Sequence, residues 1–287
     1  MSSASSSTTK SESVSELHFI TVTNTSRIWK SVSSAIMTII DEALFDAGPD
    51  GIKFRSMDPS HIALIDISWP SSAFEKYNCD STIKFGVRID EFSKIIKRAN
   101  DNDSIEIGVV RDKSLLNIKT TAGGGYLRNY KMRLIESTGN SSPLPQMTFD
   151  SKIVTGIATL DKILNDVGVI SEKITIDTSC NNSISNNKTA AIFSGESDRG
   201  ESRVIMHADD DDDDNKSEVE SLQAITVKEN SKATYNIDFI SKIIRAIGHQ
   251  SSDLVTIEYS SNKPLRLEFL LAGMVKLQFY LAPRVQD

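Results

Sequence analysis

One segment of the chain occurs twice, and this repeat restricts the folds that the chain can adopt. Residues 89–99 read IDEFSKIIKRA and residues 237–247 read IDFISKIIRAI, with six positions identical. A repeat of this kind indicates that the two halves of the chain share one architecture. In both copies the apolar residues recur at the spacing of one face of a helix. The repeat therefore predicts a duplicated fold with one such helix in each half.

Each repeat helix is predicted to be cationic on the side opposite its apolar stripe. Asp90 and Asp238 occupy the expected N-cap positions, where a carboxylate accepts hydrogen bonds from the free N–H groups of the first turn. A cationic helix face is often simply solvated. Because the cations recur in both copies here, a binding role is as well favoured as a solvated face. The cations on the two faces are Lys94, Lys97, Arg98, Lys242 and Arg245.

A further helix is expected ahead of each repeat helix. In the first half, the capping residues 24–26 precede a helix that should reach about Asp46, with Arg27 and Lys30 facing away from its core. In the second half, a helix should follow residues 152–156. The positions predicted to be buried are Ile28, Val32, Ala35, Ile36, Ile39 and Ala43 in the first of these helices, and Leu160, Ile163, Leu164 and Val167 in the second.

Short runs rich in β-branched and aromatic residues surround the helices and predict strands. The fold class that follows is α+β, with two homologous domains that each pack two helices on one side of antiparallel sheets. The glycines at 123–125 lack the setting of a phosphate loop and predict a hairpin turn. The predicted strands cover residues 18–23, 52–56, 62–69, 83–88, 104–110, 114–120, 126–134, 152–156, 173–177, 189–193, 202–206, 224–227, 254–259, 265–269 and 275–280.

Changes in composition divide the chain into four segments. Residues 1–16 are rich in Ser and Thr and are predicted to be a disordered tail. Residues 17–134 form the predicted N-terminal domain, and residues 151–287 form the C-terminal domain with an acidic insert at about 207–220. Between them, residues 135–150 are rich in Ser, Thr, Gly, Asn and Pro but contain enough apolar side chains to pack against the protein. They are the expected interdomain connector.

The charge of the chain is unevenly distributed. The net charge is −7, and the run Asp209–Asp214 accounts for nearly all of it. Any nucleic-acid site must therefore be a segregated cationic patch. The two cysteines do not provide a disulfide framework, which favours a reducing intracellular environment. No apolar run approaches the ~20 residues that span a bilayer.

The sequence contains no Gly-rich phosphate loop, no Cys/His metal spacing and no nucleophile elbow. Asp58 and His61 could form an acid/base pair, but a structured loop is the favoured interpretation because no nucleophile lies near them in the sequence. We therefore expect neither catalysis, nor a metal site, nor a cofactor. The minor alternative is a metal-dependent hydrolase that uses the run Asp209–Asp214, which is otherwise expected to be a flexible acidic loop.

Two motifs resemble signatures of the proliferating cell nuclear antigen family of DNA sliding clamps, of the archaeal type. They are GIKFRSMDPSHIALI at residues 51–65 and LQFYLAP at residues 277–283. The resemblance runs from about residue 17 to residue 287 and implies a homotrimeric, pseudo-six-fold ring whose helices line a central hole. It implies a DNA polymerase processivity factor that encircles double-stranded DNA without reading its sequence. The implied DNA contacts are Arg27, Lys30, Lys94, Lys97, Arg98, Lys162, Lys242 and Arg245.

The resemblance also implies a hydrophobic groove beneath the connector. It would bind short peptide motifs of DNA polymerases, the clamp loader, flap nucleases and ligases. Subunits are expected to join through the edge strands 126–134 and 201–208. A subunit of a heterotrimeric ring, replicative or checkpoint-type, is the alternative; either ring would work at chromosomal DNA in an archaeal cell or a nucleus. The implied groove residues are Met57, His61, Ile62, Leu64, Leu144, Pro145, Pro264, Tyr280, Leu281, Ala282 and Pro283.

Overall fold

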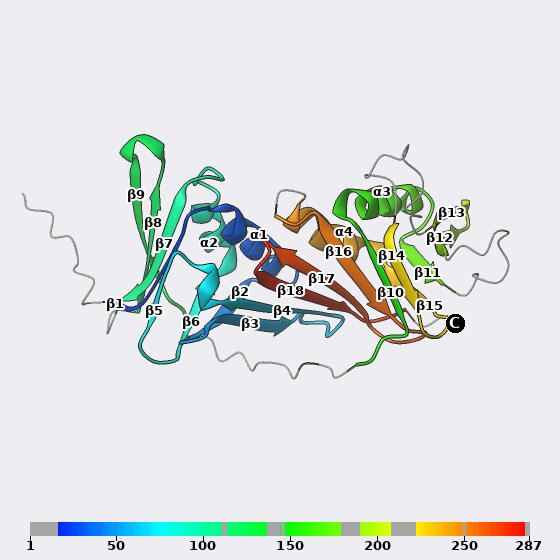
Figure 1. Cartoon of the computed structure of the whole chain (residues 1–287), viewed down its shortest axis with the longest axis horizontal. Coiled ribbons are helices and arrows are strands. Elements are labelled where there is room, and N and C mark those ends of the chain that lie inside the picture. Colours follow the sequence, from blue (N-terminus) through cyan, green and yellow to red (C-terminus); the bar gives the residue numbers. More distant parts are fainter. Residues whose placement is uncertain are drawn as a thin grey trace, which may run out of the picture.

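The chain folds into a layer of helices on a layer of antiparallel sheets. A computed structural model describes residues 17–110, 114–136, 144, 147–178, 190–207, 222–248 and 251–284. The helices lie on one side of the nine-stranded sheet, and the two smaller sheets stand at the two ends of the elongated body (Figure 1). For this part of the chain, the predicted α+β class with two homologous halves is confirmed.

Both halves have the same order of elements: a strand, a helix, five strands, a helix and three strands. The first half consists of β1 (Leu17–Thr23), α1 (Arg27–Ile36), β2 (Glu42–Gly48), β3 (Gly51–Met57), β4 (Ala63–Pro70), β5 (Lys76–Cys79), β6 (Ile83–Arg88), α2 (Ile89–Ile96), β7 (Ser104–Val110), β8 (Leu115–Thr121) and β9 (Leu127–Arg133). The second half consists of β10 (Ser151–Gly156), α3 (Ile157–Gly168), β11 (Lys173–Asp177), β12 (Ala190–Ser197), β13 (Gly200–His207), β14 (Leu222–Val227), β15 (Lys232–Asn236), α4 (Ile237–Ile247), β16 (Leu254–Tyr259), β17 (Leu265–Leu271) and β18 (Val275–Leu281).

The strands form three antiparallel sheets within the described residues. A five-stranded sheet has the order β5-β1-β7-β8-β9, and a four-stranded sheet has the order β13-β12-β11-β15. The third, nine-stranded sheet runs β14-β10-β16-β17-β18-β4-β3-β2-β6 and crosses from one half to the other. The crossing point is the pairing of β18 with β4, where Tyr280 lies opposite Leu64. The glycines at 123–125 join β8 to β9, as the predicted hairpin requires.

The duplication gives each strand an equivalent in the other half. When the elements of the two halves are matched in chain order, β9 corresponds to β18, and β4 corresponds to β13. The pair β18 and β4 joins the halves inside the chain, whereas among the described residues β9 and β13 each pair with a strand on one side only. These two open edges lie at opposite ends of the body (Figure 1). The predicted edge position of both strands is thus confirmed.

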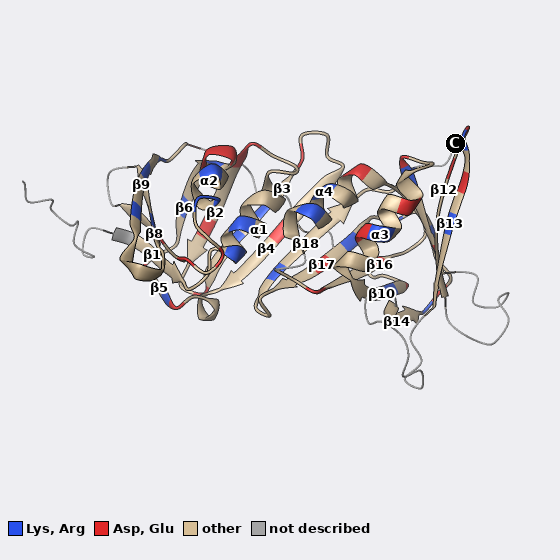
Figure 2. Ribbon diagram, turned by 90° about the horizontal axis from the view of Figure 1, so that it is seen from above, with Lys and Arg blue, Asp and Glu red and all other residues tan. Residues whose placement is uncertain are grey.

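The helices form a row along one face, in the order α2, α1, α4, α3 (Figure 2). The two halves meet between α1 and α4. Here the hydroxyl of Ser31 donates to the carbonyl of Ile247 at 3.0 Å and lies 2.6 Å from the hydroxyl of Ser251. Both serines are buried. A buried, satisfied polar contact fixes the geometry of this joint more narrowly than apolar packing alone.

Apolar helix faces pack on the sheets as the spacing predicts. Phe92 and Ile96 of α2 are buried, as are Ile240 and Ile243 of α4. The positions predicted for α3 are buried as well. Trp29 of α1 completes this core, with its ring 4.5 Å from that of Trp69 and 5.7 Å from that of Phe92. Burial of such side chains stabilises the fold by roughly 1.5–3 kcal/mol each.

The predicted length of the first helix is wrong, because α1 ends at Ile36 rather than near Asp46. Residues 42–48 form β2, which pairs with β3 and β6. Ala43, expected on the helix, is buried on this strand with Phe45 and Ala47. Their period-two spacing fits a strand, and pairing with distant strands decides the outcome.

The predicted N-caps are also displaced. The N-cap residues are Arg88 for α2 and Asn236 for α4, so Asp90 and Asp238 lie in the first turn. The side chain of Asn236 accepts the backbone N–H of Asp238 at 2.8 Å. An amide caps a helix as well as a carboxylate does, which leaves the side chain of Asp238 free for other contacts. The N-cap of α2 makes no side-chain capping hydrogen bond.

Part of the predicted connector can be described. Phe149, at its end, is buried, and Leu144 is half-buried. The predicted tail at 1–16, Pro145 and the acidic run Asp209–Asp214 lie outside the described residues.

Candidate nucleic-acid interface and partner groove

The predicted cations gather on the helix face that points away from the sheets. Figure 2 shows Lys and Arg on every helix of the row α2, α1, α4, α3. Arg27 and Lys30 of α1 are half-buried. The remaining predicted cations are exposed, namely Lys94, Lys97, Arg98, Lys162, Lys242 and Arg245. The fold therefore brings all eight predicted DNA contacts to one face.

Carboxylates accompany many of these cations. Lys30 donates to Asp101 at 2.8 Å, and this hydrogen bond holds the pKa of Asp101 below its usual value. Lys94 donates to Asp90 at 3.1 Å, one turn earlier in α2, and lowers the pKa of that carboxyl. Exposed ion pairs of this kind are worth about 0–1 kcal/mol. A phosphate that takes the place of the carboxylate must therefore offset up to about 1 kcal/mol for each pair.

The equivalent contacts in the second half involve both of its helices. Lys242 lies 2.6 Å from Asp238 within α4. Arg245 reaches across to α3, where its guanidinium lies 3.9 Å from Asp161 and donates to the side chain of Asn165 at 3.2 Å. Asp161 is next to Lys162 in the sequence, but in the fold it pairs with Arg245. A contact between residues so far apart in the chain leaves no local sequence signal.

The second candidate site begins at the loop between β3 and β4. The buried carboxylate of Asp58 accepts backbone N–H groups of Ser60 at 3.0 Å, Ile62 at 2.7 Å and Ala63 at 2.6 Å. His61 is held at φ 58° and is exposed with Ile62. Asp58 is thus committed to building the loop, which agrees with the structured-loop interpretation rather than acid/base work.

The C-terminal segment lies beside this loop. The N–H of Ala282 donates to the carbonyl of Ile62 at 2.8 Å, and the N–H of Arg284 donates to Thr234 at 2.8 Å. Met57, Pro264, Ala282 and Pro283 are half-buried, whereas Leu64, Tyr280 and Leu281 are buried. The described groove residues therefore gather at one end of the central strands of the nine-stranded sheet, where β3 and β18 end and β4 and β17 begin. Those that are buried can form only its floor.

The end of the connector is held against the sheet by a residue that sequence reasoning missed. The guanidinium of Arg266 on β17 lies 4.8 Å from the ring centre of Phe149. Its Nε also donates to Glu258 of β16 at 2.7 Å. Arg266 lies opposite Tyr280 in the β17–β18 register. The alternation of apolar and polar residues predicts the strand but not a contact with a ring outside the sheet. The role of Arg266 could therefore not be predicted from the sequence.

The open edge strands carry exposed apolar side chains. Tyr126 and Leu127, at the start of β9, are 61% and 52% exposed, and Ile205 on β13 is 42% exposed. An unpaired edge with apolar residues is a common site of contact between chains.

Within the described ranges, no group of three or more His, Cys, Asp or Glu residues is placed to hold a metal ion. No helix in the part of the chain that the structure describes is long and apolar enough to cross a membrane.

The duplicated halves and the row of cationic helices on antiparallel sheets define a chain with the two-domain clamp fold. The family model "Proliferating cell nuclear antigen, N-terminal domain" matches residues 19–137, and the corresponding C-terminal model matches residues 143–284. The chain therefore belongs to the proliferating cell nuclear antigen family.

Known proteins agree with this assignment. A DNA polymerase sliding clamp from Nitrosopumilus maritimus is 48% identical over 258 residues, which cover 90% of this chain and 95% of that protein. The crystal structure of PCNA from Thermococcus kodakaraensis has a TM-score of 0.81 at 21% identity and covers 93% of this chain and 100% of its own. A. fulgidus PCNA, solved with the C-terminal region of FEN-1 bound, has a TM-score of 0.78 at 23% identity and covers 94% and 99% of the two chains.

Proposed function

We propose that the chain is the subunit of a closed homotrimeric ring that encircles double-stranded DNA and acts as a DNA polymerase processivity factor. The observation that carries the proposal is the pair of open edges, β9 and β13, at opposite ends of the body. Their equivalents, β18 and β4, already pair within the chain. Pairing β9 of one copy with β13 of the next repeats this internal joint and forms a second nine-stranded sheet.

Such a joint is heterologous, because two different edges meet, and repeated heterologous contacts close into a ring when the rotation per copy allows it. Three copies with two halves each give the pseudo-six-fold ring that the family resemblance implies. The joint also covers the unpaired backbone groups of both edges and the exposed Tyr126, Leu127 and Ile205.

In this ring the helix row faces the hole and the duplex. The eight cations on that face contact phosphates, which gives affinity without base readout and permits movement along any sequence. They are Arg27, Lys30, Lys94, Lys97, Arg98, Lys162, Lys242 and Arg245. Closure of the ring, rather than tight binding, keeps the protein on chromosomal DNA.

The groove binds peptide motifs of replication and repair enzymes. Support comes from the exposed His61 and Ile62 beside Ala282 and Pro283, and from the related A. fulgidus PCNA, whose solved partner is the C-terminal region of FEN-1. We expect a motif with a Gln, an aliphatic residue and two aromatics, supplied by polymerases, flap nucleases, ligases and the clamp loader. An aromatic side chain in such a pocket typically contributes ~2–4 kcal/mol. The chain itself performs no catalysis and uses no cofactor in this account.

Retention on circular DNA tests the encirclement directly. The protein is loaded by a clamp loader on a nicked plasmid and washed at high salt, which screens phosphate contacts. A ring stays on the circle and is released when a restriction enzyme linearises it. Equal loss from circular and linear DNA would show that the protein binds without encircling.

A further inference from the structure

The two halves of the helix face differ in charge. In the first half, α1 and the segment 89–98 present Arg27, Lys30, Lys94, Lys97 and Arg98. In the second half, the cations are Lys162, Lys242 and Arg245, and the carboxylates on and beside α3 and α4 are Asp161, Asp166, Glu172 and Asp238. Counted in this way, the second half has four carboxylates for three cations. The first half has only three carboxylates, Asp90, Glu91 and Asp101, for its five cations, although both halves have the same fold.

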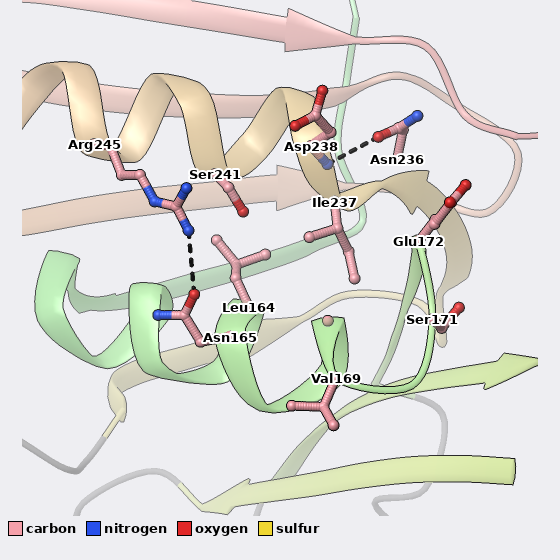
Figure 3. Close-up of a pocket in the computed structure, with 11 residues that line it drawn as sticks. Leu164, Asn165, Val169, Ser171, Glu172, Asn236, Ile237, Asp238, Ser241 and Arg245 are labelled. Atoms are coloured by element: carbon pink, nitrogen blue, oxygen red, sulfur yellow. Dashed lines mark hydrogen bonds between the residues drawn. The ribbon is translucent and has the colours of Figure 1, made fainter. Parts of the chain in front are cut away.

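The cations of α4 are held by carboxylates of their own half. Lys242 lies 2.6 Å from Asp238, and Arg245 lies 3.9 Å from Asp161. The guanidinium of Arg245 also donates to Asn165 at 3.2 Å, so it leans from α4 toward α3 (Figure 3). To bind a phosphate, both side chains must first leave these partners.

The space between α3 and α4 does not suit a phosphate either. A depression of about 650 Å³ lies between the two helices. Arg245 and Asn165 lie at one end of it, while Asp238 and Glu172 lie at the other (Figure 3). Two carboxylates at the mouth of a depression repel an anion, and the single cation there already has partners.

The cations at the C-terminal end of α2 differ from those of α4 in their ion pairs. Lys97 is the C-cap residue of α2, Arg98 follows it, and both side chains are exposed. Among the described residues, neither has a carboxylate within ion-pair distance. A phosphate can therefore bind them without breaking an existing pair. Cations at the C-terminal end of a helix are also favoured by its dipole, which keeps them in place.

We propose that Lys97 and Arg98 provide the main phosphate contacts of the ring, and that Asp161 and Asp238 make the α3–α4 face nearly neutral toward DNA. This inference rests on the proposed encirclement of DNA by the helix face. The duplex then lies closer to the first half of each subunit. It also follows that affinity for DNA is limited by carboxylates on the same face, which suits a protein that slides.

Two matched double variants test the difference between the halves. Lys97→Ala with Arg98→Ala removes the same charge as Lys242→Ala with Arg245→Ala. Binding of the intact protein to a short labelled duplex is measured by fluorescence anisotropy over a range of salt concentrations. The first variant should lose about tenfold in affinity and flatten the salt slope by roughly one for each lost phosphate contact. The second should change affinity by less than about threefold. Equal losses would overturn the inference.

A gain of binding provides the second test. Asp161→Asn with Asp238→Asn releases Arg245 and Lys242, and should tighten duplex binding severalfold with a steeper salt slope. The matched control is Glu136→Gln with Glu229→Gln, an equal charge change at exposed residues beside the two ends of the connector. It should leave binding unchanged. Equal gains from both variants would show only an effect of net charge and would overturn the inference.

These outcomes separate the inference from the function on which it rests. If the wild-type protein is not retained on circular DNA, the proposed encirclement fails and the inference fails with it. If it binds and is retained on circles, but the variants do not differ, only the assignment of Lys97 and Arg98 fails.

Discussion

The carboxylate of Asp58 accepts the backbone N–H of Ala63 at 2.6 Å, and so closes the loop that joins β3 to β4. The same oxygen accepts the N–H of Ile62 at 2.7 Å. One buried side chain therefore sets the positions of His61 and Ile62, two exposed residues of the proposed partner groove.

Removal of this carboxylate should weaken both the fold and the groove. Asp58→Ala leaves buried N–H groups without an acceptor, which should cost about 2–4 kcal/mol of unfolding free energy, measured by urea denaturation. Asp58→Asn, which keeps one acceptor oxygen, should cost less. The exposed turn residue Asp198 provides a control, since Asp198→Ala should have little effect. If Asp58→Ala were as stable as wild type, the loop would be held by other contacts.

Tyr280 should act in partner binding through its ring rather than through its hydroxyl. Its side chain is buried, and its hydroxyl donates to Gln278 at 3.2 Å. Tyr280→Phe should therefore bind a partner peptide almost as wild type does in calorimetry. Tyr280→Ala should lose the peptide, but it also empties a buried site and should destabilise the fold by ~3–5 kcal/mol. Loss of binding in both variants would point to a direct hydroxyl contact instead.

Arg266 should fasten the end of the connector. Arg266→Ala removes the contact with Phe149 at 4.8 Å and leaves Glu258 without its partner. Hydrogen exchange of the amides at 147–150 should then become faster, because this segment opens at lower free energy. Arg266→Lys keeps the charge but not the planar stacking, and should give an intermediate rate. Unchanged exchange in Arg266→Ala would show that the connector is held elsewhere.

Glu268 should contribute a pH-dependent part of stability. Its burial alone would raise its pKa, but hydrogen bonds from Lys276 and Gln278 outweigh this effect and lower the pKa below its usual value. The folded state therefore favours the charged form. Its contribution is present above the ordinary pKa of Glu, about 4.3, and is lost as the pH falls through the lower folded value. Glu268→Gln should differ from wild type in urea stability at neutral pH, and the difference should shrink below about pH 4. A constant difference would contradict this account.

Local periodicity in the sequence was enough to predict the repeat helices. The apolar spacing that contains Phe92 and Ile240 places both faces correctly. It failed at residues 42–48, where Ala43 continues the helical spacing of Ile36 and Ile39 but pairing with β3 and β6 makes the segment a strand. The short strands β5 and β15 were missed because neither contains a run long enough to show alternation.

Much of the candidate site depends on contacts between distant residues. The cations of the helix face could be predicted, since each lies opposite an apolar stripe. The partners of Lys94 and Lys242 lie four residues away on the same helix, which is a spacing visible in the sequence. The pair of Asp161 and Arg245 could not be predicted, because these residues belong to different helices. The groove residues came from the family resemblance. That Leu64 and Leu281 are floor rather than surface depends on the pairing of β4 with β18.

The pairing of β9 with β13 between copies is the central claim, and the mass of the protein in solution tests it most directly. Light scattering at micromolar concentration should give three times the 31.6 kDa mass of the chain. Ile205→Asp, which places a charge on the β13 edge, should reduce the mass to that of one chain without unfolding it. A wild-type mass of one chain at all concentrations would contradict self-closure and would indicate a ring that requires distinct subunits.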